Sequence, residues 1–465
     1  MRTLLVLPFL AASILHSADC RISTADRRLQ FAPAAVETND WRAEVRLDAN
    51  ALRQTIDGFG PALTGSSCHN LMRLPTERRR AILKECFGER GWNCVRVSIG
   101  CSDFSLDEYT YCDTPGIEHF ALTRYETDEL FPVLREVLEI NPKVRILASP
   151  WTCPRWMKVK DLKSLEPYHS WTGGQLNPKH YGAYADYFVR YLQAMQQAGF
   201  EVDWLTIQNE PLNRFNSASL FMGWKEQRDF LKQALGPALA RAGLKTKVLL
   251  WDHNYNYDKV AGQTDYVRRI LADPAAARYA AGSAWHAYMN GDKNELLKIH
   301  DSAPEKEIHF TEYSSGKWSY PFEKDFMWSM EELGIGCVNR WCRSVVIWNF
   351  LLDERCGPKR PKGCQTGIGA LTVDFTASGG PSIVRESHYF LLSHLSHAFS
   401  PGARILKSPE RPIPGVLFCA GLNPDGSCGV AIGNQSTETR LLTVSCQGRQ
   451  ATFRLPPQSF ASGRF

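Results

Sequence analysis

The sequence predicts an α/β protein, a (β/α)₈ TIM barrel with a small antiparallel β-sandwich as a side domain. Eight runs dense in Val, Ile, Leu and aromatic residues recur between residues 55 and 350, as expected for strands buried on both faces of a parallel sheet. Helical patterns separate these runs, which favours a barrel. No Gly-x-Gly-x-x-Gly motif follows an early run, which disfavours the competing open doubly wound sheet.

The elements alternate in order along the chain. The clearest helix, 177–199, opens with Asn-Pro and closes on Gly, which are good start and stop signals. The predicted strands are 55–60, 94–100, 144–150, 202–208, 247–253, 282–288, 307–313 and 344–350. The predicted helices are 75–87, 124–140, 177–199, 225–243, 264–273, 292–301, 324–342 and 384–399.

The two ends of the chain have a different residue pattern from the predicted barrel. After residue 400, short alternating runs are split by Pro, Asp-Gly and Asn turns, the pattern of an antiparallel domain. The strand-like stretch 41–48 precedes the barrel and is expected to pair with the C-terminal strands. The predicted segments are a signal peptide (1–18), one or more N-terminal strands of the β-sandwich (24–50), the barrel (51–400) and the C-terminal part of the β-sandwich (401–465).

The N-terminus predicts export to the periplasm or the extracellular space. Arg2 precedes an apolar run, 4–15, that is followed by small residues, as in a signal peptide. That run is too short to cross a bilayer, and no other run reaches eighteen apolar residues, so no transmembrane segment is expected. A lipid anchor at Cys20 is the less favoured alternative, because Asp19 before it fits poorly.

Export would place the fourteen cysteines in an oxidising compartment. Cys356 and Cys364 bracket a short loop and are the best disulfide candidates. One more bridge is expected among Cys419, Cys428 and Cys446.

The composition limits the classes of ligand and partner that the sequence predicts. The net charge of +5 is small and the basic residues are not clustered, so nucleic acid is not expected. No Cys or His cluster has zinc spacing, so neither a metal nor a cofactor is predicted. Thirteen Trp and sixteen Tyr are compatible with a carbohydrate substrate, because rings stack on sugar faces, although most of these rings are expected in the core. The oligomeric state is left open.

Two carboxylates stand where predicted barrel strands end. The fourth strand ends in Asn209-Glu210-Pro211, and the seventh ends at Glu312. Active sites of such barrels form at these strand ends. A facing pair of carboxylates is the minimal machinery for glycoside hydrolysis.

The stretches "DGFGPALTGSS", "RVSIGCSDFSLDEYTYCDT", "ILASPWTCPRWMK", "LTIQNEP", "HAY" and "FTEYSSG" make the chain similar to glycoside hydrolase family 30, within it the glucosylceramidase-like branch. The resemblance implies a (β/α)₈ barrel with a β-sandwich, no cofactor, and retention of configuration. It also implies that Glu210 is the general acid/base and Glu312 the nucleophile, about 5–5.5 Å apart. Proximity to the Glu312 carboxylate is expected to raise the pKa of Glu210, so that it stays protonated.

Other strand ends supply candidate site residues. Arg96 is buried by its context and needs an anionic partner, for which Glu312 is the natural candidate. Asn209 is placed to bind the sugar 2-OH, and Tyr288 to bond Glu312. His286 is expected to line the pocket.

The remaining candidates are expected to contact the sugar. Asp103 in "CSDFS" resembles the family residue that binds distal hydroxyls of a glucosyl unit. Trp151 and Trp348 should flank the sugar ring, with Asn349 touching it.

One loop departs from the glucosylceramidase pattern. After the eighth strand the chain reads "CGPKRPKGC", with Lys359 where that pattern has Asn, which predicts a rigid cationic rim and weakens the case for a ceramide-like aglycone. The favoured prediction is an exported, retaining, glucosylceramidase-type β-glucosidase. The alternatives are an endo-β-1,6-glucanase, or a β-xylosidase or β-fucosidase, on the same machinery, and more remotely an inactive carbohydrate-binding barrel.

Overall fold

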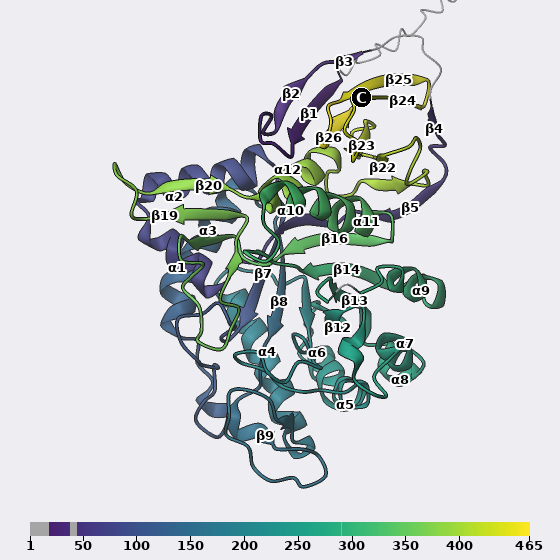
Figure 1. Ribbon diagram of the computed structural model, residues 1–465. Coiled ribbons are helices and arrows are strands. Elements are labelled where there is room, and N and C mark those ends of the chain that lie inside the picture. The colour runs from purple at the N-terminus through teal and green to yellow at the C-terminus, as the bar shows by residue number, and fades with distance from the viewer. Residues whose placement is uncertain (1–17, 38–43, 290) are drawn as a thin grey trace, which may run out of the picture.

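The computed structural model describes residues 18–37, 44–289 and 291–465. The chain forms a barrel with a β-sandwich beside it (Figure 1). The predicted signal peptide, apart from Ala18, lies outside the described residues, as do residues 41–43 of the predicted N-terminal strand. Among the described helices, none has the length and apolar character needed to cross a membrane.

The barrel is a sheet of eight parallel strands, each overlapping one predicted run, in the order β6-β16-β14-β13-β12-β11-β8-β7. The ring closes where Ala62 bridges Arg96 in parallel, with the Leu63 amide donating to the Arg96 carbonyl over 2.8 Å. The predicted barrel is therefore confirmed. Its strands are β6 (Gly58–Pro61), β7 (Cys94–Ile99), β8 (Arg145–Pro150), β11 (Trp204–Thr206), β12 (Lys247–Asn254), β13 (Ala280–His286), β14 (Glu307–Glu312) and β16 (Cys342–Ile347).

Helices surround this sheet and are more broken than predicted. Four predicted helices contain short π-helical segments, at 84–89, 125–130, 231–235 and 330–335. The helices are α1 (Gly65–Arg73), α2 (Thr76–Leu83), α3 (Phe131–Ile140), α4 (Tyr181–Gln197), α5 (Trp224–Phe230), α6 (Gly236–Arg241), α7 (Tyr266–Leu271), α8 (Pro274–Ala277), α9 (Glu295–Ser302), α10 (Phe322–Ser329), α11 (Gly336–Val338) and α12 (Ser387–Ala398).

The β-sandwich combines both ends of the chain, as Figure 1 shows by colour. One sheet has the order β2-β1-β26-β23-β22-β21-β5 and the other β3-β25-β24-β4, and α12 packs on β26 and β23. The strands are β1 (Asp19–Thr24), β2 (Ala32–Ala34), β3 (Val36–Glu37), β4 (Val45–Leu47), β5 (Leu52–Thr55), β21 (Arg404–Leu406), β22 (Val416–Leu422), β23 (Cys428–Asn434), β24 (Arg440–Cys446), β25 (Arg449–Leu455) and β26 (Ser459–Arg464).

The loop after β16 carries a small sheet that the sequence did not predict. Its strands β17 (Leu351–Asp353), β19 (Leu371–Asp374) and β20 (Ser382–Arg385) fold beside the barrel, and α12 follows them. The sheet holds the two ends of the "CGPKRPKGC" loop beside the barrel mouth.

The disulfide predictions are wrong. All fourteen cysteines are described and all are free thiols, including Cys356, which is buried, and Cys364, which is partly exposed. Cys428 and Cys446 approach each other between the two sandwich sheets, but as thiols. Most of the cysteines are buried as small apolar side chains, in keeping with the usual packing of free Cys.

Candidate active site

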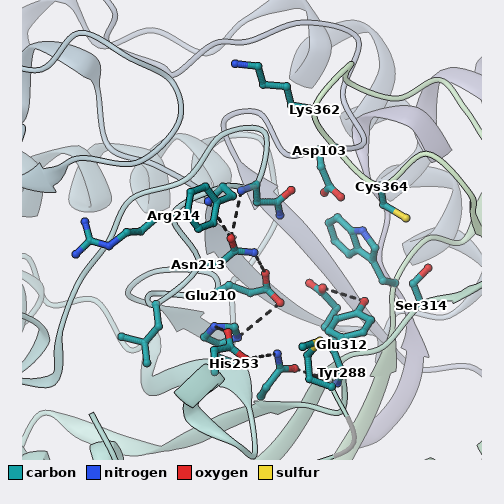
Figure 2. A pocket seen from close by; sticks show the side chains of 18 of the residues that line it. Asp103, Glu210, Asn213, Arg214, His253, Tyr288, Glu312, Ser314, Lys362 and Cys364 are labelled. Atoms are coloured by element: carbon teal, nitrogen blue, oxygen red, sulfur yellow. Dashed lines mark hydrogen bonds and ion pairs between the residues drawn. The ribbon is translucent and has the colours of Figure 1, made fainter. Parts of the chain in front are cut away.

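A pocket of about 710 Å³ opens at the carboxyl ends of the barrel strands (Figure 2). Glu210 and Glu312 both line it, together with Asp103, Tyr288 and Trp348. Catalytic residues of such barrels sit at this end, on the loops that follow the strands. The two strand-end carboxylates of the sequence therefore share one cavity.

Glu210 reaches the pocket through irregular backbone. The β11 ladder ends at Thr206, earlier than the sequence suggested, but the Glu210 amide still donates to the Asp252 carbonyl over 2.9 Å. Glu210 has a φ of 45°, in the left-handed region that non-glycine residues seldom adopt. Such strain persists only where surrounding contacts hold it, and it concentrates at functional sites.

Arg96 is the buried hub beneath the pocket. Its side chain is 0% exposed and pairs with Glu312 and, at 2.9 Å, with Asp252. It also donates to Asn209 Oδ1 over 2.8 Å. Burial would lower the pKa of Arg96, but Asp252 and Glu312 outweigh that effect and raise it. Arg96 thus stays a cation and fixes the position of Glu312.

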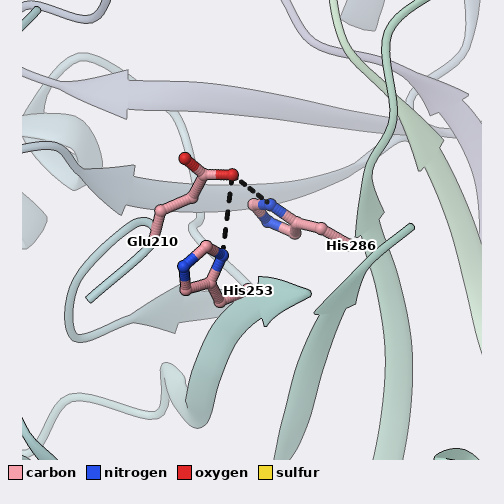
Figure 3. A group of neighbouring side chains, drawn as sticks. All are labelled: Glu210, His253 and His286. Carbon is pink, nitrogen blue, oxygen red and sulfur yellow. Dashed lines mark hydrogen bonds and ion pairs between the residues drawn. The ribbon is translucent and has the colours of Figure 1, made fainter. Parts of the chain in front are cut away.

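Two imidazoles converge on Glu210 (Figure 3). His286 Nδ1 lies 3.3 Å and His253 Nδ1 3.6 Å from the same oxygen, Oε1. The other nitrogen of each ring faces a carboxylate, Asp252 at 3.0 Å from His286 and Asp258 beside His253. Each carboxylate fixes its ring, so that both rings present Nδ1 to Glu210.

The same His286 nitrogen also lies 3.8 Å from Glu312 Oε1, which links the two carboxylates of the pocket. Burial alone would lower the pKa of His286, but Glu312, Asp252 and Glu210 outweigh it and raise the pKa to about 9. His286 therefore holds a proton at neutral pH between the two carboxylates.

Glu312 is held from two sides. Arg96 contacts one oxygen, and the Tyr288 hydroxyl donates to the other over 3.2 Å. Burial raises the pKa of Glu312, and the cations His286 and Arg96 do not fully offset it because Glu210 and Asp252 push in the same direction as burial.

The expected pKa direction for Glu210 is wrong in the free protein. Burial does raise the pKa of Glu210, but His253, His286 and a 2.8 Å hydrogen bond from Asn213 outweigh it, and the net direction is down. The sequence could not show this, because both imidazoles come from other strands. In the free protein the proton shared at this site is held by His286, whose pKa is raised, rather than by Glu210.

Asp103 stands in the pocket wall with unmet hydrogen-bonding capacity. Its side chain is buried, and Oδ1 has no partner among the described residues. Burial, with Glu312 and Glu210, raises the pKa of Asp103 to about 8. A polar atom left unpaired at a pocket wall suits a ligand hydroxyl.

The "CGPKRPKGC" loop closes the pocket beside Asp103. The Arg360 amide donates to the Asp103 carbonyl over 2.8 Å, and Lys362 lines the mouth (Figure 2). Lys359 does not reach the mouth, because its ammonium donates to the Arg355 and Gln365 carbonyls of its own loop. The cationic character of the rim comes from Lys362 instead.

The other predicted residues form the layer behind the wall. Trp151 stacks on Trp348 with ring centroids 5.0 Å apart, and only Trp348 faces the cavity. Asn349 is fully buried and accepts a hydrogen bond from Thr64. Asn209 and His286 are also buried and do not line the cavity, so they act on it through Arg96, Glu210 and Glu312.

Sequence reasoning missed Asp252, His253 and Asp258. The first two end β12 in the stretch "WDHN", so the strand-end rule that selected Glu210 would have found them. Asp258 follows on the next turn and carries no signal of its own.

Glu210, His253 and His286 could also hold a metal ion, since their ligand atoms lie within 4.8 Å of one another. The second nitrogen of each ring faces a carboxylate, as in many metal sites. A metal there would occupy the oxygen of Glu210 that otherwise exchanges a proton. Metal binding and acid/base chemistry at Glu210 are therefore mutually exclusive.

A (β/α)₈ barrel with two carboxylates facing one pocket at its strand ends has the groups that glycoside hydrolysis requires. The model of the glycosyl hydrolase family 30 TIM-barrel domain matches residues 56–397. The chain belongs to glycoside hydrolase family 30.

Known proteins of two kinds resemble the chain. The solved structure of the endo-beta1,6-glucanase BT3312 is 43% identical with a TM-score of 0.93, covering 96% of this chain and 99% of that one. The endo-1,6-beta-D-glucanase neg1 of Aspergillus fumigatus is 28% identical over 95% of this chain and 93% of its own. The lysosomal acid glucosylceramidase of Mus musculus is 26% identical over 90% of this chain and 83% of its own.

Proposed function

We propose that the protein is an endo-β-1,6-glucanase that hydrolyses β-1,6-linked glucan with retention of configuration. The observation that carries this proposal is the 43% identity to an endo-beta1,6-glucanase over nearly the whole of both chains. The glucosylceramidase-type activity that the sequence favoured has weaker support, because the identity to glucosylceramidases is 26% for the lysosomal enzyme of Mus musculus and 31% for putative glucosylceramidase 1 of Caenorhabditis elegans, against 43% for the solved endo-beta1,6-glucanase. The departure of the "CGPKRPKGC" loop from the glucosylceramidase pattern also weakens the case for a glucosylceramidase.

In the first step, Glu312 attacks the anomeric carbon of the glucosyl unit while Glu210 protonates the leaving oxygen. The bond between the anomeric carbon and that oxygen breaks, and a glucosyl ester of Glu312 forms. Arg96 and Tyr288 hold the Glu312 carboxylate, one on each oxygen, so that it meets the substrate in one orientation.

In the second step, Glu210 takes a proton from a water molecule that attacks the same carbon. The ester bond to Glu312 breaks, and the sugar leaves with its original configuration. The same carboxyl group thus acts first as acid and then as base.

His286 supplies the proton that Glu210 needs at the start. The proton rests on His286 in the free protein, and the Nδ1 to Oε1 distance of 3.3 Å allows it to pass to Glu210. Transfer leaves a neutral imidazole beside a protonated Glu210, which is the state that the first step requires.

One experiment tests this function. Purified protein is incubated side by side with a β-1,6-glucan, with glucosylceramide and with aryl β-xyloside, and the products are separated over time. We expect early release of β-1,6-linked oligosaccharides of mixed length from the glucan. Glucose released only from glucosylceramide, or from the glucan ends alone, would overturn the endo-β-1,6-glucanase assignment.

A further inference from the structure

A second cavity of about 550 Å³ lies beside the catalytic pocket. The two cavities share three lining residues, Tyr288, Met289 and Trp318. Met289 and Trp318 are exposed, at 74% and 51%, although both are large apolar side chains. The wall between the two cavities is therefore an exposed apolar ridge, which soluble proteins seldom keep without use.

Aromatic rings run from the catalytic centre into this second cavity. The Tyr288 ring, whose hydroxyl bonds Glu312, stacks on Tyr313 with centroids 5.2 Å apart. Tyr313 in turn lies 4.6 Å from the ring of Trp328, at the far side of the cavity. Trp318 lies within hydrogen-bonding reach of the Tyr313 hydroxyl. Flat apolar faces with polar edges are the surface on which sugar rings pack.

The cavity also has polar groups with free capacity. Asp325 on α10 is 2% exposed and lines the cavity. Its Oδ2 accepts hydrogen bonds from Ser315 and Ser387, but its Oδ1 has no partner among the described residues. Lys324, which is exposed, lines the same cavity. A few polar groups among aromatic rings are typical of a small-molecule site.

The second cavity adjoins the catalytic pocket across the residues that line both. Asp103 and the loop that covers it bound one end of the catalytic pocket, and Glu312 and Tyr288 line the same pocket (Figure 2). A glucosyl ring held at Asp103 therefore has its scissile bond near Glu210 and Glu312. A leaving group that turns toward Tyr288 would pass over Met289 and Trp318, which line both cavities.

We propose that the cavity lined by Tyr313, Trp318, Lys324, Asp325 and Trp328 binds a further glucosyl unit of β-1,6-linked glucan on the leaving-group side. This inference rests on the proposed function. A β-1,6 linkage has an additional rotatable bond between its rings, so successive units can turn over the ridge from one cavity to the next. The rings of Trp318, which is exposed, and Trp328, which is partly exposed, pack on the sugar, and Asp325 Oδ1 accepts a hydrogen bond from a sugar hydroxyl.

The test compares long and short substrates. Trp328→Leu and Lys324→Ala are assayed on a β-1,6-linked glucotetraose and on an activated aryl β-glucoside, which is too short to enter the second cavity. We expect kcat/KM on the tetrasaccharide to fall about five- to tenfold for Trp328→Leu, and by less for Lys324→Ala, with the aryl glucoside unchanged. Trp224→Leu, which alters a partly buried tryptophan beside a different surface hollow, is the matched control.

The results distinguish failure of the proposed function from failure of the second-cavity proposal. If the wild-type protein does not cleave the β-1,6-linked tetrasaccharide, the proposed function fails. If it does, and both variants match wild type on both substrates, the second cavity is not a glucan subsite. Since Lys324 is exposed, Lys324→Ala remains informative even if Trp328→Leu unfolds. A Glu312→Gln protein, titrated calorimetrically with di- and tetrasaccharide, should bind the longer one more tightly, and equal affinity would contradict the proposal.

Discussion

Strand β14 carries a carboxylate at each end, Glu307, partly buried, at its start and Glu312, buried, at its finish. Burial raises the pKa of both, yet the two shifts end in opposite directions. At Glu307 the hydrogen bond with His309 and the cations Lys247 and Arg343 outweigh burial and lower the pKa. At Glu312 the cations His286 and Arg96 are opposed by Glu210 and Asp252, and the pKa rises.

The two pKa values shift in opposite directions because Glu312 has other carboxylates beside it. Glu307 also accepts a hydrogen bond from the Trp204 indole over 3.0 Å, so its charge is fully paired within the lower end of the barrel. At the upper end, Glu210, Glu312 and Asp252 share Arg96 and His286. The lower cluster stabilises the fold, and the upper one holds reactive groups in place at some cost in stability.

The same substitution at the two ends of β14 should give opposite results, and Glu312→Gln should have the largest effect. We expect it to lower kcat on an aryl β-glucoside by at least about a thousandfold, because it removes the nucleophile. The melting temperature should change little. Turnover near that of wild type would contradict the nucleophile assignment.

Glu307→Gln should lower the stability of the fold and leave kcat almost unchanged. Loss of the charge removes the anion that Lys247 and Arg343 share. Because Lys247 is half-exposed and Arg343 keeps Asp57 as a partner, we expect about 1 kcal/mol of destabilisation. Thermal and urea denaturation measure this loss, while kcat below the melting temperature should stay within about twofold of wild type. A large drop in kcat with an intact fold would break the contrast between the two ends.

His253, which contacts Glu210 at the upper end of the barrel, allows a test of whether that cluster serves catalysis or stability. His253→Asn removes one of the two rings that hold Glu210, and we expect about a tenfold loss of kcat on aryl glucosides with poor leaving groups. Substrates with good leaving groups need no protonation and should be spared. Asp258→Asn, which frees the His253 ring, should give a smaller loss of the same kind. Equal losses on both substrate types would show that His253 only stabilises the fold.

The pH dependence should be the smallest of these effects. The pKa of His286 is raised to about 9, above the value of about 6.5 expected in the unfolded chain. Its contribution to stability is therefore complete below about pH 6.5 and is lost as the pH rises through about 9. Melting temperatures measured across this range should fall more for wild type than for His286→Asn. Glu307→Gln should keep the wild-type slope, and a slope unchanged in His286→Asn would argue against the shift.

The sequence was sufficient for the barrel and for the carboxylate pair, because buried parallel strands leave long apolar runs and their ends mark the active face. Glu210 and Glu312 were found in this way. Asp252 and His253 also end a barrel strand, β12, and lie beside Glu210, where His253 helps to lower the pKa of that carboxyl group. The pKa direction of Glu210 depends on rings from β12 and β13, and no pattern near residue 210 encodes it.

The cysteines show a different limit. The spacing of Cys356 and Cys364 around a Pro-rich loop suggested a bridge, but spacing does not fix the direction in which the side chains point. The loop is held instead by hydrogen bonds from Lys359 and Gln365 to its own carbonyls. The predicted export remains a prediction.

Trapping the intermediate tests the central claim most directly. The protein is incubated with an activated 2-deoxy-2-fluoro-β-glucoside, whose fluorine slows hydrolysis of the ester, and the labelled peptide is mapped by mass spectrometry. The account predicts one fluoroglucosyl group per chain, on Glu312, and no label in the Glu312→Gln protein. A label on Glu210 or another carboxylate, or inverted product without any label, would contradict it.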